Sequence, residues 1–206
     1  MEAAHDAVAR VGGLVSLARF FVSLSISWRI WQARDSSVVA FIPLAADVIE
    51  LYAWLLCGIA TRHVGMTRFY AFGLALMTFN ATVHRLYSSW TGPGLALIAA
   101  LLVITTASSE MTTAGLIKVT RICALLARLA PVVRILTCPL PEMAAFALVL
   151  CGLRTLLGVI DGDVWDVAWN IPGTIVAAVE VGVTLGKGPH GSQLLLVRHD
   201  VKLLQR

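Results

Sequence analysis

Seven long apolar segments alternate along the chain with short polar stretches. They cover residues of about 11–28, 38–61, 67–87, 94–109, 113–133, 143–160 and 164–185. An α-helix needs roughly 17 to 25 mostly apolar residues to cross a membrane, and these segments meet or nearly meet that length. Their connections are short, as is typical of helices that pack as antiparallel neighbours. The pattern therefore predicts an all-α membrane protein with seven transmembrane helices.

The composition supports this prediction and excludes several classes of protein. Of the 206 residues, 58% are hydrophobic and only 14% are charged, whereas soluble domains carry roughly 25% charged residues. The net charge of +4 is scattered along the chain, which argues against nucleic acid as a partner. Motifs for nucleophilic catalysis, phosphate binding and metal binding are also missing. We therefore expect a membrane protein that is not an enzyme and has no cofactor.

The two halves of the chain share a spacing of glycines. Gly58 and Gly73 lie fifteen positions apart, and so do Gly158 and Gly173. Internal repeats are common in transporters, and here the fourth segment is left over between two sets of three. An odd linker helix makes the two sets run parallel to each other. The predicted units are a first three-helix bundle (1–91), a linker helix (92–112), a second three-helix bundle (113–186) and a cytoplasmic tail (187–206).

The positions of lysine and arginine predict the orientation, because cytoplasmic loops carry an excess of them. With the N-terminus outside, the inner loops and tail hold Arg29, Arg34, Arg85, Arg128, Arg134, Lys187, Arg198, Lys202 and Arg206. The outer loops and their edges hold Arg10, Arg62, Arg68 and Lys118. We therefore expect an outside N-terminus and a cytoplasmic C-terminus. The expected location is the plasma membrane, with an organelle membrane as the alternative, and the oligomeric state, including a homo-oligomer, stays open.

The last two segments carry a family resemblance. Residues 157–160 (Leu-Gly-Val-Ile), then Asp163, then residues 169–173 (Trp-Asn-Ile-Pro-Gly) resemble the passage between the sixth and seventh helices of the SWEET family of sugar uniporters. The resemblance implies two triple-helix bundles that move sugars in both directions by alternating access, as in other carriers built from repeats. It also implies hinge prolines within the helices, for which Pro43 and Pro131 are the candidates.

The chain also departs from the family pattern. Leu157 replaces an aromatic residue, and Ser23 and Ala145 stand where the family has hinge prolines in its first and sixth helices. The family has a facing pair of asparagines in its third and seventh helices. Asn170 matches one member of that pair, but Tyr70 takes the place of the other, so a symmetric pair of sugar-binding amides is absent.

A sugar site needs amide or carboxylate groups for the hydroxyls and aromatic faces for the ring. The candidates for substrate contact are Asn170, Trp169, Tyr70, Trp54 and Trp165. An alternative interpretation is that the asparagine links neighbouring helices and that the aromatic residues mark the membrane interface. The expected partners are a small sugar and the lipid bilayer.

Charged residues inside the predicted spans form a second set of candidates: Arg19, Asp47, Glu50, Arg154 and Glu180. A central charge costs about 2.5 to 3.5 kcal/mol on insertion scales, so each should face a partner or a wet cavity. Asp47 and Glu50 share a helix face, and the resemblance places the second and sixth helices on opposite sides of the pore. We therefore expect both carboxylates to cluster with Arg154 along the solute pathway, where they would admit proton coupling and where Arg154 would contact substrate. A structural salt bridge between helices is the alternative.

A non-transporting protein is the main competing hypothesis. Lys118, Arg121 and Arg128 lie near one face of the fifth segment, as they would in an amphipathic helix that lies on the membrane surface. That pattern is typical of membrane-shaping proteins of the peroxisome-proliferating type. The seventh segment and the matched glycines favour the transporter.

Overall fold

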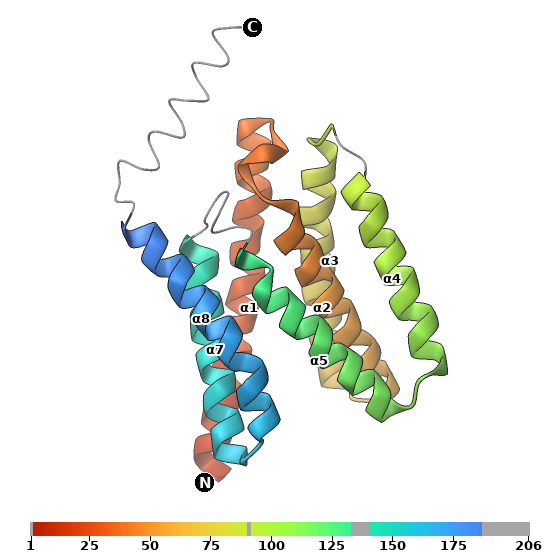
Figure 1. Ribbon diagram of the computed structural model, residues 1–206, viewed down its shortest axis with the longest axis vertical. Coiled ribbons are helices and arrows are strands. Elements are labelled where there is room, and N and C mark those ends of the chain that lie inside the picture. The colour runs from red at the N-terminus through yellow and green to blue at the C-terminus, as the bar shows by residue number, and fades with distance from the viewer. Residues whose placement is uncertain (1, 90–91, 133–140, 187–206) are drawn as a thin grey trace, which may run out of the picture.

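The computed structural model describes residues 2–89, 92–132 and 141–186, and this part of the chain is helical apart from its turns. The elements are α1 (Glu2–Ala33), the short 3₁₀ helix η1 (Ser36–Val38), α2 (Phe41–Ala60), α3 (Val64–Leu86), α4 (Gly92–Glu110), α5 (Thr113–Leu129), α7 (Pro141–Asp161) and α8 (Val164–Gly186). In Figure 1, α1 begins at one end of the molecule and α8 ends towards the other. The predicted tail, 187–206, lies outside the described residues.

The fold is that of an all-α membrane protein, as the hydrophobic pattern predicts. Five of the helices are long and apolar enough to cross a membrane: α1, α2, α4, α7 and α8. The other two, α3 and α5, do not meet this combination of length and apolar composition, and α5 has only 17 residues. α3 packs against both α1 and α2, and α5 packs against both α2 and α8. Their buried faces therefore carry polar residues such as Asn80 and Thr120, each fully buried.

Six of the helices form a closed ring around the centre of the molecule. In contact order the ring runs α1, α3, α2, α5, α8, α7 and back to α1, and α4 packs outside it on α2 (Figure 1). In each set of three, the helix that comes last in the sequence lies between the other two in the ring. The two sets meet along two seams, α1 against α7 and α2 against α5. Corresponding helices of the two sets run in the same direction in Figure 1.

The turns between α2 and α3 and between α7 and α8 are built alike. The backbone nitrogen of His63 donates to the carbonyl of Gly58 at 2.9 Å, and that of Asp163 donates to Gly158 at the same distance. The preceding residue has a positive φ in both turns, +54° at Arg62 and +69° at Gly162. These left-handed residues end one helix and reverse the chain within a few residues.

The matched glycines lie where the next helix approaches most closely. A Cβ atom on Gly58 would lie 3.1 Å from the backbone nitrogen of Thr67, and one on Gly158 would lie 3.0 Å from that of Val167. Only a residue without a side chain lets two helix backbones come this close. Helix packing therefore requires a glycine at both of these positions.

The φ of +69° at Gly162 generates a stability prediction. Gly162→Ala should lower the free energy of unfolding by about 1 kcal/mol, because an L-residue is strained in the left-handed region. Arg62→Gly should raise it by a similar amount, since Arg62 bears that strain already. The measurement is thermal unfolding of the purified protein in detergent.

Gly152→Ala is the matched control. Gly152 lies within α7, and a Cβ atom there would have no neighbour within 4 Å. Gly152→Ala should raise the free energy of unfolding by up to about 1 kcal/mol, because alanine favours the helix more than glycine does. If Gly162→Ala proved as stable as Gly152→Ala, the argument from φ would be wrong.

Candidate functional site

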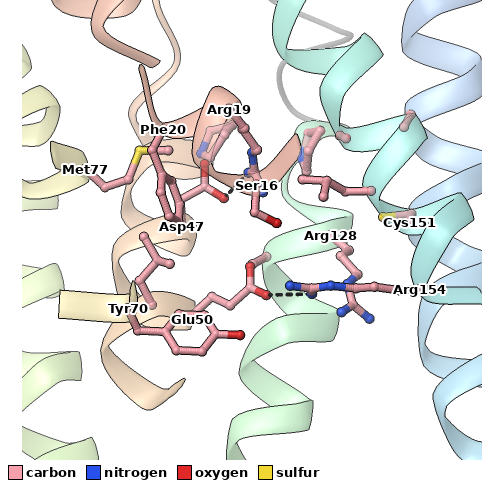
Figure 2. A pocket seen from close by; sticks show the side chains of 18 of the residues that line it. Ser16, Arg19, Phe20, Asp47, Glu50, Tyr70, Met77, Arg128, Cys151 and Arg154 are labelled. Atoms are coloured by element: carbon pink, nitrogen blue, oxygen red, sulfur yellow. Dashed lines mark hydrogen bonds and ion pairs between the residues drawn. The ribbon is translucent and has the colours of Figure 1, made fainter. Parts of the chain in front are cut away.

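A cavity lies inside the ring of six helices, about half-way along most of them. Every ring helix contributes to its lining, and α4 contributes no residue. Its charged lining residues are Arg19, Asp47, Glu50, Arg128, Arg154 and Glu180. Much of the remaining lining is apolar, including Phe20, Leu51, Phe69 and Met77. The cavity thus gathers charges from both halves of the chain within a largely apolar enclosure (Figure 2).

The periodicity of α2 aims two carboxylates into this cavity. Asp47 and Glu50 are three positions apart and therefore lie on one face, separated by about 4.5 Å along the helix axis. The guanidinium of Arg19, on α1, donates from Nη2 to Oδ1 of Asp47 at 2.7 Å. The Asp47 side chain is only 10% exposed. This pair holds α1 and α2 together within the first set of three helices.

The second carboxylate reaches across the cavity to the other set of helices. Oε1 of Glu50 lies 3.8 Å from Nη1 of Arg154, on α7. Figure 2 shows the two side chains extending towards each other. At this distance the groups attract as charges but do not share a direct hydrogen bond. The pair therefore joins the two halves by a long contact, in contrast to the short one between Arg19 and Asp47.

A missing side chain on α8 makes room for Arg128. A Cβ atom on Gly173 would lie 3.0 Å from both Cβ and Cδ of Arg128 and 2.9 Å from Sγ of Cys151. Nη1 of Arg128 donates to the backbone carbonyl of Trp169 at 2.9 Å. Gly173 therefore allows α5 to bring a third guanidinium to the cavity wall.

The seam between α1 and α7 has a polar side-chain contact at each end. Near the end of α1, Arg29 pairs with Glu142 at the start of α7. Near the start of α1, Nε2 of His5 lies 3.4 Å from Oδ2 of Asp161 at the end of α7. These groups are partly exposed, with 50% of the Asp161 side chain accessible. The cavity lies between these two contacts.

The structure brings together part of the candidate set from the sequence. Tyr70, Asp47, Glu50, Arg154, Pro43 and Pro131 all line the cavity. The expected cluster of two carboxylates with Arg154 is divided in two, because Arg19 takes Asp47 and leaves Glu50 to Arg154. Their role in binding a solute stays a prediction.

The other described candidates do not line the cavity. Asn170 is buried on the same face of α8 as Gly173 but does not line the described cavity. Trp54 stacks on the ring of Tyr70, with centroids 5.6 Å apart and planes at 12°. Trp169 contributes its backbone carbonyl to Arg128. The side chain of Trp165 lies outside the described residues.

Two charged candidates without an assigned partner, Arg19 and Glu180, also line the cavity. Their charge inside apolar segments signals them, but the sequence does not show which of these charges meet. Arg128 is the charged lining residue that was not expected there. Arg128 is read as part of a basic helix face, whereas it lines the cavity. Among the described residues no three of His, Cys, Asp and Glu gather as a metal site.

The two candidate hinge prolines lie at helix ends and not in the middle of helices. Pro43 lies in the first turn of α2, where backbone N–H groups have no partner within the helix, so it leaves the helix unbroken. Pro131 follows the end of α5. Pro172 lies inside α8, where it removes an intrahelical hydrogen bond. Of these three prolines, Pro172 is the one that lies inside a helix, past its first turn. The hinge role of Pro43 and Pro131 stays a prediction.

Comparison with known proteins identifies the fold and no family. No protein-family profile matches the sequence, and no curated protein matches it. Among solved structures, a eukaryotic SWEET transporter determined at 3.7 Å resolution matches with a TM-score of 0.63 and 12% sequence identity. The match covers 87% of this chain and 94% of that one. The resemblance seen in the sequence thus extends to the fold.

The buried pair of Arg19 and Asp47 generates a prediction about stability. Asp47→Asn should lower the free energy of unfolding by about 3 to 5 kcal/mol, because it leaves a guanidinium enclosed without its countercharge. Adding Arg19→Met to that variant should recover most of the loss. Thermal unfolding in detergent measures both changes.

Asp161→Asn is the control, since it removes a half-exposed carboxylate that also belongs to an ion pair. It should cost less than about 0.5 kcal/mol, as exposed pairs do. Equal losses for Asp47→Asn and Asp161→Asn would show that enclosure of the pair is unimportant.

Proposed function

We propose that this protein is a membrane carrier that moves a small polar solute, expected to be a sugar, in both directions by alternating access. The observation that supports this most directly is the charged cavity inside the ring. It lies about half-way along most of the ring helices, is lined by both sets of three helices, and has no described lining residue from α4. A carrier needs such a site between two parts that can move against each other.

The proposed movement is a rocking of the two sets of helices. They would act as repeats related by an axis along the membrane normal, with α4 as the linker. The polar contacts at the two ends of the α1–α7 seam support this interpretation, because each can close one mouth of the cavity. A solute that binds both arrangements needs no ion gradient or nucleotide to cross. The proposed mechanism is therefore facilitated transport.

The sugar class is supported by the family resemblance and by part of the lining. Carboxylates can accept hydrogen bonds from hydroxyls, and the ring of Tyr70 offers a face for a sugar ring. The orientation with an outside N-terminus, the plasma membrane location and a homo-oligomeric assembly belong to the same proposal. They rest on the charge distribution and the resemblance.

Packing of α5 weighs against the membrane-shaping alternative. That hypothesis needs an amphipathic helix lying at an edge, with its polar face in water. Here α5 is a member of the ring, and its buried stripe is Leu116, Thr120, Ala124 and Ala127. The hydroxyl of Thr120 donates to the carbonyl of Ala53 on α2 at 3.3 Å.

The first functional test is solute flux into liposomes that hold the purified protein. A panel of labelled mono- and disaccharides should show at least one saturable flux in both directions, because alternating access needs no energy source. Dissipating the proton gradient should leave its rate unchanged. Liposomes without protein are the control. If no sugar and no charged solute showed saturable flux, the proposed carrier function would be refuted.

A second test locks the α1–α7 seam. With the native cysteines replaced, Arg29→Cys and Glu142→Cys should allow a short bifunctional thiol reagent to join the two sets of helices. Flux should fall by more than about tenfold, because opening of the mouth is a step of the cycle, and a cleavable reagent should allow recovery.

Arg34→Cys with Tyr87→Cys is the matched control. These residues join α1 to the end of α3 within one set, through a hydrogen bond of 2.9 Å. Cross-linking them should leave flux within about twofold, since rocking moves the sets as units. Equal inhibition at both sites would contradict movement of whole sets.

A further inference from the structure

The charges of the cavity are balanced. Its described lining holds three arginines, Arg19, Arg128 and Arg154, and three carboxylates, Asp47, Glu50 and Glu180. A solute with a net charge would leave one charge uncompensated in a site enclosed by apolar helices, which is costly. A solute without net charge keeps the balance. The cavity therefore favours molecules that are neutral overall.

The lining differs from what an uncharged sugar requires. No asparagine or glutamine occurs among the described lining residues, although amides bind hydroxyls without attracting ions. The polar groups are mainly charged, and charged groups gain most from ligands of opposite charge. Neutral overall charge combined with charged contacts describes a zwitterion.

Such a solute would bind at the contact between Glu50 and Arg154. This contact is longer than the pair of Arg19 and Asp47, at 3.8 Å compared with 2.7 Å. The Arg154 side chain is 34% exposed, and Figure 2 shows its guanidinium facing Glu50 within the cavity. A solute carboxylate on Arg154 and a solute ammonium on Glu50 would replace one long contact by two charge-assisted hydrogen bonds.

A second arginine of the cavity lining, Arg19, has a hydrogen-bond donor that is not used within the described part of the chain. Nε of Arg19 is buried and has no hydrogen-bond partner among the described residues, although Nη2 of the same side chain binds Asp47. Buried donors are normally satisfied. An acceptor oxygen on a bound solute would satisfy this one.

We propose that the cavity also takes small zwitterions, molecules with one ammonium and one carboxylate group such as amino acids, in preference to uncharged sugars. This inference rests on the proposed carrier function and not on the sugar class. Glu50 binds the ammonium and Arg154 binds the carboxylate. Because these residues belong to opposite sets of helices, the solute replaces the ion pair that joins the sets and so couples its binding to their movement.

The test compares solutes of similar size and different charge in liposomes that hold the full chain. The probes are glutamine as the zwitterion, glutamate with one net negative charge, lysine with one net positive charge, and glucose. Glutamine should show saturable flux at least about tenfold faster than glutamate, lysine and glucose, because it alone matches both charges.

Variants assign the site. Glu50→Gln and Arg154→Gln should each lower glutamine flux by about tenfold or more and bring the ratio of glutamine to glucose flux close to one, since each removes one charged contact. The double variant Glu50→Arg with Arg154→Glu should recover glutamine flux, because a zwitterion can bind in reverse. A salt bridge with a purely structural role would leave the flux ratio unchanged. Size-exclusion chromatography establishes that each variant is folded.

The outcomes separate this inference from the proposed function. Flux of glucose without flux of glutamine would overturn the proposed preference for zwitterions and leave the proposed carrier function intact. Saturable flux of none of the probes or sugars would overturn both. If a variant failed to fold, the preference of the unaltered protein for glutamine would still decide the proposal. Normal glutamine flux in both single variants would overturn the assignment to Glu50 and Arg154.

Discussion

The arrangement of this protein depends on how charged side chains are accommodated inside a bundle of apolar helices. An ionised group in such a place needs a countercharge or water. The six charges of the cavity meet this requirement by gathering inside the ring rather than facing outwards. The outward faces of the same helices carry residues such as Ile171, Ile175 and Val179. The ring therefore keeps these charged side chains on its inner side, and by doing so it encloses the cavity.

Ion pairs within one set of helices and between the two sets have different consequences. The short pair of Arg19 and Asp47 links α1 to α2 and is nearly enclosed, so it stabilises the first set as a unit. The long pair of Glu50 and Arg154 spans the two sets. A carrier needs units that are rigid inside and movable against each other. The distribution of these two contacts is suited to that need.

Helix packing in the two sets uses different side chains for the same topology. The main hydrophobic core lies chiefly in the first set, with Phe20, Ile26 and Met77 among its members. There, Asn80 links α3 to α1, since its Nδ2 donates to Oγ of Ser23 at 2.9 Å. One hundred positions later, on α8 in the second set, Glu180 is fully buried and lines the cavity. The two sets therefore bury different polar chemistry.

Local patterns were enough to establish the class of fold from sequence. Helix lengths, the short connections and the fifteen-residue spacing between glycines depend on interactions between residues near each other in the chain, or on the need to be apolar in lipid. The similar turns and close helix approaches at Gly58 and Gly158 explain the glycine at the start of each spacing. The relation between the two sets as true repeats stays a prediction.

The partners within the site were decided only by tertiary structure. The sequence identifies Asp47, Glu50 and Arg154 as charges that must be compensated, but several pairings satisfy that demand equally well. Packing of the helices brings Arg19 to Asp47 and leaves Asn170 out of the cavity lining. Hydrophobicity is a property of each residue and can be read along the chain, whereas the choice of countercharge depends on distances between helices that only their packing sets.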